Sequence, residues 1–286
     1  MNLGIGQLIS GRYAPVQPIG NGAFGAVYAA IDQSTGREVA LKFLTNMAQT
    51  ERFRREARML QDYAHPNVVE VLDARLDHVP PFIAMEFCQF GSLRSWVQNR
   101  RPWREVAMAI SQAAAGLTAL HAQGGFHRDI KPDNILVARH PSQAGAVIKV
   151  GDFGVAREPE TAGLMTRTAW GTDGYRAPEL LKGASFTHAC DVYSLGVVAV
   201  ELLTGQRTTL TLGGHSLPGG FVALVGAMCA VQPEARPAMR QVAEQASAVS
   251  ANPEASVVVP SSTDDGTGLL LGGLLAVGLI WALSKK

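Results

Sequence analysis

Two short polar segments in the middle of the chain constrain its fold more than any other feature. They read His127-Arg128-Asp129-Ile130-Lys131-Pro132-Asp133-Asn134 and, further on, Asp152-Phe153-Gly154. Asn134 and Asp152 offer oxygen ligands, which suit Mg²⁺, a hard ion that also binds nucleotide phosphates. A fold for this chain therefore has to bring both segments to one site.

A glycine-rich segment precedes them, Gly20-Asn21-Gly22-Ala23-Phe24-Gly25-Ala26-Val27. Glycines let a backbone pass close over phosphates, because a Cβ atom would clash and because positive φ is open to glycine. The same spacing also opens dinucleotide-binding folds, but there a helix follows the glycines directly. Here the residues up to Asp32 have the character of a strand, which favours a hairpin.

A lysine follows on an apolar strand, in Val39-Ala40-Leu41-Lys42. A buried lysine without a partner is unfavourable, so its position implies an acidic partner. Glu56 lies in the next helical pattern, on the same face as Leu60, and is the predicted partner. Such an ion pair would hold the ammonium group against the α- and β-phosphates of a nucleotide. The alternative is that both residues are solvated charges.

The secondary-structure signals divide the chain into two unlike parts. Strand-favouring residues dominate 12–45, 68–73 and 82–87. Helical patterns cover 50–62 and then 104–123, 190–203 and 221–244. A strand-rich first third followed by a helix-rich remainder is typical of an α+β fold with two lobes.

In this order the motifs resemble those of the eukaryotic-like (Hanks-type) Ser/Thr protein kinase family, over residues 13–245. The resemblance implies a two-lobed protein kinase fold in residues 10–247, with a β-rich N-lobe at about 10–87 and a helical C-lobe at about 91–247. It implies an ATP- and Mg-dependent enzyme that transfers the γ-phosphate to Ser and Thr hydroxyls of proteins, itself included. Asp129 would accept the hydroxyl proton, and Lys131 would steady the γ-phosphate. The Asp-x-Lys-Pro-x-Asn pattern is that of Ser/Thr rather than Tyr kinases.

The resemblance also assigns nucleotide contacts. Adenine would lie between Val27 and Ala40 on one side and Leu136 on the other, and the backbone after Met85 would read its edge. His127 would pack in the core beneath the site. The predicted nucleotide-binding residues are Ile19, Gly20, Asn21, Gly22, Ala23, Phe24, Gly25, Val27, Ala40, Lys42, Glu56, Glu86, Cys88 and Leu136, and the predicted metal ligands are Asn134 and Asp152.

Two further residues of the second half receive structural roles from the resemblance. Glu179, in Ala177-Pro178-Glu179, is expected to pair with Arg236. Asp191 is expected to anchor the 127–134 loop from a buried helix, although an acidic residue at this place can also be a helix N-cap.

The segment between Asp152 and Glu179 is expected to carry regulation. Arg128 would bind a phosphate placed on Thr166 or Thr168, and Thr172 would line the substrate hydroxyl site. Residues 206–220 are shorter than the corresponding stretch of the family, which puts substrate docking on that surface in doubt.

Composition excludes some classes of protein. The net charge of +1 and the isoelectric point of about 7.8 give no sign of a nucleic-acid partner. Cys88, Cys190 and Cys229 have no metal-ligand or disulfide spacing, and we expect three buried free thiols, as in a reducing cytosol.

The last part of the sequence predicts a membrane anchor. Residues 248–267 are rich in Ser, Pro, Gly and acidic residues and read as a flexible linker. Residues 268–283 carry no charge and predict a transmembrane helix, somewhat short of a ~30 Å hydrocarbon core. The flanking charges oppose the positive-inside rule. Because a kinase needs cytosolic ATP, we still expect a single-pass protein with the kinase domain in the cytoplasm.

Small residues recur every four positions in this helix, at Gly268, Gly272 and Ala276. Such a stripe lets two membrane helices approach closely, so self-association is one interpretation. The other is that glycine is simply frequent in membrane helices.

Three functions remain open at this point. The first is a membrane-tethered Ser/Thr kinase, whose protein substrate and activating signal the sequence does not reveal. The second is a binding scaffold without catalysis, which the intact Lys42, Asp129 and Asp152 oppose. The third is a small-molecule phosphotransferase, which the polypeptide-presenting segment up to Glu179 opposes.

Overall fold

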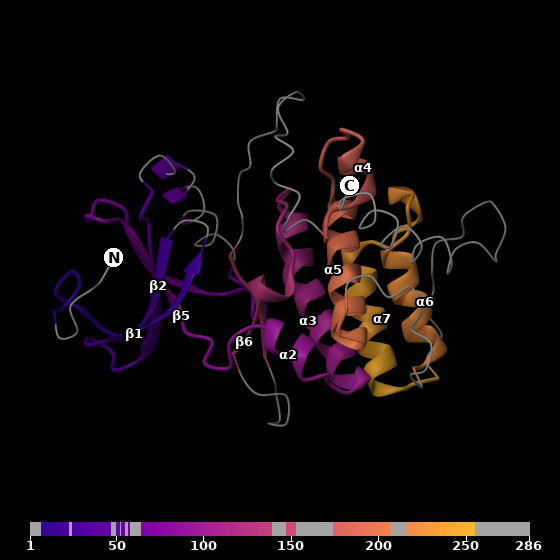
Figure 1. The fold of residues 1–286 in the computed structure, drawn as a ribbon, viewed down its shortest axis with the longest axis horizontal. Coiled ribbons are helices and arrows are strands. Elements are labelled where there is room, and N and C mark those ends of the chain that lie inside the picture. The colour runs from indigo at the N-terminus through magenta and orange to yellow at the C-terminus, as the bar shows by residue number, and fades with distance from the viewer. Residues whose placement is uncertain are drawn as a thin grey trace.

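A strand-rich part and a helix-rich part lie side by side along the long axis of the molecule (Figure 1). The computed structural model describes residues 7–22, 25–46, 50–51, 53–54, 57, 64–138, 147–152, 174–206 and 217–254. We call the two parts the sheet lobe and the helical lobe. This arrangement confirms the predicted two-lobed α+β fold.

The sheet lobe is built on an antiparallel sheet with strand order β1-β2-β3-β5-β4. The aromatic rings of Tyr13, Tyr28, Phe43 and Phe82 pack on one another inside it, with Tyr28 and Phe43 edge to face at 6.0 Å between ring centroids. These bulky side chains favour strands and fill the space that the sheet encloses. The strands are β1 (Tyr13–Gly22), β2 (Gly25–Asp32), β3 (Glu38–Phe43), β4 (Val71–Arg75) and β5 (Phe82–Glu86).

The glycine-rich segment forms the predicted hairpin, because β1 pairs with β2 in antiparallel register up to Gly22 opposite Gly25. Gly25 has φ +148°, and a Cβ atom there would lie 2.5 Å from the carbonyl oxygen of Phe43 and 2.6 Å from Thr45 Oγ1. No other residue fits this approach of β2 to the end of β3.

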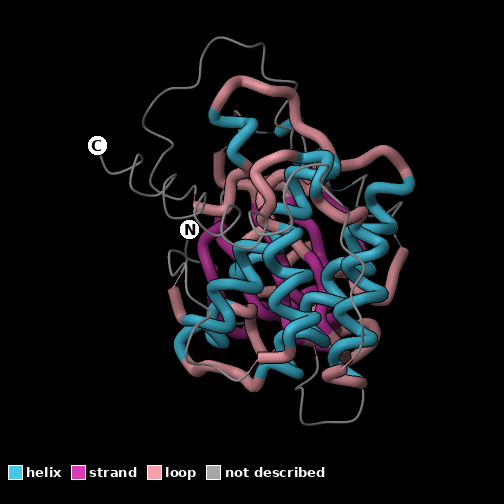
Figure 2. Tube along the Cα trace, turned by 90° about the vertical axis from the view of Figure 1, so that its right-hand side faces the viewer, coloured by secondary structure: helices cyan, strands magenta, loops and turns pink. Residues whose placement is uncertain are grey.

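The helical lobe is arranged around one central helix, α5. Every residue of α5 from Cys190 to Thr204 is buried, as expected of a helix that is apolar on all sides. Figure 2 views the molecule from this side, with the helices in front of the strands. The helices are α2 (Arg94–Gln98), α3 (Trp103–Ala122), α4 (Pro178–Leu181), α5 (His188–Thr204), α6 (Gly219–Met228) and α7 (Met239–Ala251), with the 3-10 helices η2 (Pro132–Asn134) and η4 (Pro233–Ala235).

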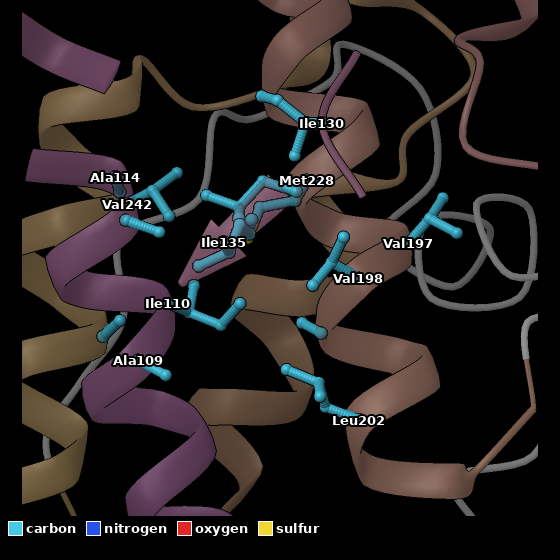
Figure 3. Packing of buried hydrophobic residues seen from close by; sticks show 14 of the residues in the cluster. Ala109, Ile110, Ala114, Ile130, Ile135, Val197, Val198, Leu202, Met228 and Val242 are labelled. Atoms are coloured by element: carbon cyan, nitrogen blue, oxygen red, sulfur yellow. The ribbon is translucent and has the colours of Figure 1, made fainter. Parts of the chain in front are cut away.

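A two-stranded ladder joins this lobe to the sheet lobe. It consists of β6 (Ile135–Val137) and β7 (Ile148–Val150), which pair in antiparallel register. Figure 3 shows part of the core behind it, into which Ile110 of α3, Ile135 of β6 and Val198 of α5 all point. The ladder is therefore packed against the hydrophobic core of the helical lobe.

Some predicted boundaries differ from the structure. The expected helical stretch 221–244 is divided into α6 and α7, since Pro233 and Pro237 lie between them and proline interrupts helical hydrogen bonding. α7 continues to Ala251, past the expected domain boundary at residue 247. β4 begins at Val71 and ends at Arg75, slightly later than the expected strand.

Two further expectations concern the cysteines and the last part of the sequence. Cys88, Cys190 and Cys229 are buried free thiols, which confirms the prediction. Residues 268–283 lie outside the described residues, and none of the helices that the structure describes is long and apolar enough to span a membrane.

The two lobes touch where the loop at 64–69 meets α3. A Cβ atom on Gly116 of α3 would lie 2.5 Å from the carbonyl oxygen of Asn67. The Nδ2 atom of Asn67 donates to Gln112 Oε1 at 3.1 Å and to the carbonyl oxygen of Ile148 at 2.9 Å. Glycine at position 116 therefore permits a close contact between a helix of one lobe and a loop of the other.

Replacing this glycine tests the contact. We expect Gly116→Ala to lower the free energy of unfolding by about 1–3 kcal/mol, because overpacking outweighs the helix-propensity gain of alanine. Gly219→Ala in α6 is the matched control, since nothing lies within 4 Å of a Cβ atom there. The measurement is thermal unfolding of both variants, and equal midpoints would contradict the steric argument.

Candidate active site

The 127–134 loop follows α3 and presents Asp129 at its surface. The Oδ2 atom of Asp129 accepts a hydrogen bond from Lys131 Nζ at 2.8 Å and from Asn134 Nδ2 at 3.0 Å. Asn134 Nδ2 also donates to the backbone carbonyl of Asp129 at 2.7 Å. The Asp129 side chain remains 48% exposed, so a carboxylate in fixed orientation faces incoming groups.

Lys42 of the sheet lobe reaches Asp152 of the helical lobe. Its Nζ atom lies 2.5 Å from Asp152 Oδ1, and the Lys42 side chain is only 4% exposed. Burial raises the pKa of Asp152, but the charge and hydrogen bond of Lys42 outweigh this, so that the pKa lies below its ordinary value. Asp152 is thus a carboxylate at neutral pH, available to ligate a cation.

The backbone around Asp152 is held in an unusual conformation. Asp152 has φ +51°, in the left-handed region, which is strained for a residue other than glycine. The preceding Gly151 N–H donates to the carbonyl oxygen of Asn134 at 2.9 Å. This bond connects the two polar segments and keeps the metal-ligand candidates Asn134 and Asp152 close in space.

His127 lies beneath the loop, where the sequence placed it. It is fully buried, accepts the N–H of Asp129 at Nδ1 over 3.3 Å, and donates from Nε2 to the carbonyl oxygen of Gly151 over 3.1 Å. Burial lowers its pKa, so the ring is neutral and its two bonds define one tautomer. His127 therefore connects the two polar segments through its hydrogen bonds to Asp129 and Gly151.

Asp191 of α5 anchors the loop, which confirms the prediction. Its carboxylate accepts the backbone N–H of His127 at 2.9 Å and that of Arg128 at 3.0 Å, and it also contacts His121 Nε2 at 2.9 Å. The alternative role as a helix N-cap is wrong, since Thr187 occupies that position. Arg128 has φ +68°, a strained conformation that these bonds stabilise.

The predicted nucleotide-contacting residues lie on elements that border this site. Ile19, Gly20, Asn21 and Gly22 end β1, Gly25 and Val27 begin β2, and Ala40 and Lys42 belong to β3. Glu86 ends β5, Cys88 follows it, and Leu136 lies in β6. Ala23, Phe24 and Glu56 lie outside the described residues, as do Thr166, Thr168 and Thr172, so the predicted Lys42–Glu56 pair stays a prediction.

The donor set suits a magnesium–nucleotide complex. Because Asn134 Nδ2 donates to Asp129, its amide oxygen is the atom that this side chain can offer to a cation. One carboxylate and one amide oxygen leave room for the waters and phosphates with which Mg²⁺ completes its octahedral shell. The buried ammonium of Lys42 beside Asp152 is suitably placed to meet the same phosphates.

A contact that the sequence did not reveal ties the end of β5 to β7. Lys149 Nζ lies 2.8 Å from Glu86 Oε2. Burial and the Glu86 charge raise the pKa of the nearby Cys88 thiol to about 12, so it is not a reactive thiolate. The charge of Glu86, a predicted nucleotide-contacting residue, is thus paired within the protein.

The predicted Glu179–Arg236 pair is present in the helical lobe. The guanidinium of Arg236 donates to both carboxylate oxygens of Glu179, at 2.7 and 2.8 Å, which confirms the prediction. Burial raises the pKa of Glu179, but the hydrogen bonds and charge of Arg236 lower it by more, so that the pKa lies below its ordinary value. This bidentate pair fixes the position of α4 against the helical lobe.

A second unpredicted cluster includes Asp133, at the end of the loop that carries Asp129. Arg94 of α2 contacts Asp133 of the loop, Tyr175 before α4 and Glu201 of α5. The available sequence signal was Glu201, an acid inside the apolar run from Leu195 to Leu203, which required a partner.

Comparison with known proteins adds independent information. A family model described as protein kinase domain matches residues 13–246. The chain is 36% identical over 211 residues to the "Probable serine/threonine-protein kinase pknA2" of Bifidobacterium longum, covering 70% of this chain and 27% of that protein. It is 33% identical over 211 residues to the "Probable serine/threonine-protein kinase PknB" of Lactococcus lactis, covering 71% and 33%. It is 37% identical over 207 residues to the "Serine/threonine-protein kinase Pkn1" of Myxococcus xanthus, covering 68% and 29%. The chain thus spans between 27% and 33% of the length of these relatives.

The anchoring role of Asp191 can be tested by stability. Asp191→Asn replaces one acceptor oxygen by a donor group that faces other donors, and we expect it to lower the free energy of unfolding by about 1.5–3 kcal/mol. Asp77→Asn, at an exposed position, is the control and should change stability little. Chemical denaturation measures both. A loss in Asp191→Asn no larger than in the control would show that the carboxylate does not hold the loop.

Proposed function

Because this chain belongs to the protein kinase family, we propose that it transfers the γ-phosphate of ATP to Ser and Thr hydroxyls of proteins, itself included. One observation carries the proposal. Lys42, Asp129 and Asp152, which come from three separate parts of the sequence, converge between the two lobes with Lys131 and Asn134 beside them.

Each residue has a defined task in this mechanism. The substrate hydroxyl oxygen forms a bond to the γ-phosphorus, the bond to the β–γ bridging oxygen breaks, and ADP leaves. The hydroxyl proton passes to the Asp129 carboxylate, which the bonds from Lys131 and Asn134 orient. Lys42 would hold the α- and β-phosphates, and Lys131 the γ-phosphate.

We propose Asn134 and Asp152 as the protein ligands of Mg²⁺. When bound, the ion neutralises charge on the phosphate oxygens. The depressed pKa of Asp152 supports this role, because its carboxylate is charged at neutral pH. Two observations support specificity for Ser and Thr. Lys131 lies two residues after Asp129, and the relatives are named serine/threonine-protein kinases.

The decisive experiment incubates the purified full-length chain with labelled ATP and Mg²⁺ and maps phosphosites by mass spectrometry. Transfer to Ser or Thr residues, with autophosphorylation at Thr166 or Thr168, is the expected result. Absence of any transfer would favour the scaffold reading, whereas transfer only to small alcohols would favour a small-molecule phosphotransferase.

Two substitutions test the residues. We expect Lys42→Met and Asp152→Asn each to reduce phosphate transfer by about 10²-fold or more, since both remove charges from the phosphate and metal site. Arg240→Ala, which breaks only the exposed pair with Glu244, should retain full activity. Circular dichroism checks that all three variants fold. Undiminished transfer by either site variant would contradict the mechanism.

We further propose that residues 268–283 tether the kinase domain to a membrane, with that domain in the cytoplasm, and that they pair two copies. The uncharged run and the stripe at Gly268, Gly272 and Ala276 support this. Pairing would raise the local concentration of one domain for another, toward millimolar for flexible linkers.

The tail is tested by comparing Gly272→Ile with the wild type in the same membrane. A branched side chain in the stripe should keep the helices apart, so that crosslinking and autophosphorylation both fall. Gly273→Ile, which carries the same change outside the stripe, is the control. Equal crosslinking of all three proteins would refute pairing, and their recovery in the soluble fraction would refute the anchor.

A further inference from the structure

His121 and His188 form a stacked pair beside the loop that carries Asp129. Their imidazole rings lie 4.4 Å apart between centroids and are inclined by only 22°. His121 belongs to the last turn of α3, and its Nε2 atom lies 2.9 Å from Asp191 Oδ2. Because a carboxylate only accepts hydrogen bonds, this nitrogen carries a proton. His188 is the first residue of α5 and is exposed, so its ring covers one face of the His121 ring.

The helix α5 brings the two ends of this contact together. His188 and Asp191 are three positions apart, a spacing that places two side chains on the same face of a helix. The His121 ring lies against both, stacked on His188 and bonded to Asp191. Asp191 also accepts the backbone N–H groups of His127 and Arg128. The stacked pair therefore shares this carboxylate with the loop.

A second contact runs from His188 to the start of the loop. The centroid of the Phe126 ring lies 4.8 Å from that of His188 and 5.5 Å from that of Phe186. The guanidinium of Arg128 lies over both phenylalanine rings, at 5.6 and 5.7 Å from their centroids. Phe126 directly precedes His127, the first residue of the loop. The His188 ring thus packs against the entry to the loop as well as against its anchor.

The charges around His188 disfavour protonation of its ring. Within the described residues, the charged groups that face it are His121 on α3, Asp191 on α5 and, beyond the Phe126 ring, Arg128 of the loop. Burial against the neighbouring rings lowers the pKa of His188, the charge of His121 lowers it further, and Asp191 raises it, so that the pKa lies below its ordinary value of 6.5. The helix dipole acts in the same direction, because it is positive at the N-terminus of α5.

Acid therefore acts against the stacked arrangement. The unfolded chain takes up the His188 proton at about pH 6.5, whereas the folded chain takes it up at a lower pH. The stability that the neutral ring contributes is thus complete above about pH 6.5 and is lost as the pH falls below that value. Because His188 is exposed, its protonated ring can turn away from His121 into water. Phe126 then loses the His188 ring as a packing partner.

We propose that His188 is a positioning residue for phosphate transfer, which supports the adjacent loop through His121 and Phe126 while its ring is neutral and releases the loop in mild acid. The inference rests on the proposed kinase function and adds its regulation by pH. His188 acts on Asp129 through the backbone of the loop rather than by contact with the reacting groups.

The experiment compares phosphate transfer to a peptide with a single Thr by the full-length wild type and by His188→Phe, which keeps an aromatic ring but takes up no proton. At about pH 7.5 we expect equal kcat values, since the histidine ring is neutral there. On acidification to about pH 5.5, the ratio of wild-type to variant kcat should fall about threefold or more, since one pKa unit is a tenfold change in protonation. The ratio cancels the titration of ATP and of Asp129, which both proteins share.

Two further variants separate charge from packing. His188→Gln removes both the proton and the ring, so its kcat should be lower than that of His188→Phe and should lack the wild-type acid dependence. It carries the comparison where His188→Phe is not recovered folded. His78→Phe makes the same change in the sheet lobe, where the His78 ring packs on Phe82 at 5.1 Å between centroids, and should keep the wild-type profile.

NMR titration of the histidine rings gives a readout that does not depend on activity. In the wild type, we expect the His188 ring to titrate below its ordinary pKa of 6.5. In His121→Phe it should titrate at a higher pH than in the wild type, because the charge of His121 is removed while an aromatic ring stays against His188.

The outcomes are distinguishable. Equal pH profiles of the wild type and both His188 variants would overturn this inference and leave the proposed function intact. A His188 ring that titrates at the same pH in the wild type and in His121→Phe would also overturn it. Absence of transfer by the wild type at every pH would overturn the proposed function, and with it this regulation.

Discussion

A buried carboxylate organises this molecule. Asp191 lies in α5, whose residues from Cys190 to Thr204 are all buried, so its charge has no access to water. An uncompensated charge there would be unfavourable by several kcal/mol. The chain satisfies it with two backbone N–H groups of the 127–134 loop and with His121. Hydrogen bonding in the core thereby sets the shape of the loop on the surface, including the left-handed backbone of Arg128.

The fold and the centre of the site were predictable because their signals are local. Lys42 on an apolar strand, Asp129 in the 127–134 segment and Asp152 in Asp152-Phe153-Gly154 each belong to a short pattern with a chemical reason. The Glu179–Arg236 pair and the burial of His127 followed from the family resemblance and agree with the structure. The nucleotide and metal contacts themselves stay predictions, since they depend on molecules that bind between the lobes.

The remaining features depend on partners far apart in the sequence. Arg94 and Glu201 are 107 positions apart, and no periodic pattern selects one arginine among many for one buried acid. The same holds for Lys149 and Glu86. Pro233 and Pro237 indicated that the expected helix 221–244 is divided. The helical spacing of apolar residues on both sides nevertheless favoured one continuous helix. Long-range electrostatics is therefore what sequence reasoning missed here.

The contact of Gly116 with Asn67 has a mechanical meaning. Backbone bonds from Val69 N to Val150 O, and from Val150 N to Asn67 O, fasten the same loop to β7. These contacts hold the sheet lobe at one edge of its sheet, because β4 follows the loop whereas β1 is at the opposite edge. If the sheet lobe rotated about this loop, the glycine hairpin of β1 and β2 would be displaced furthest.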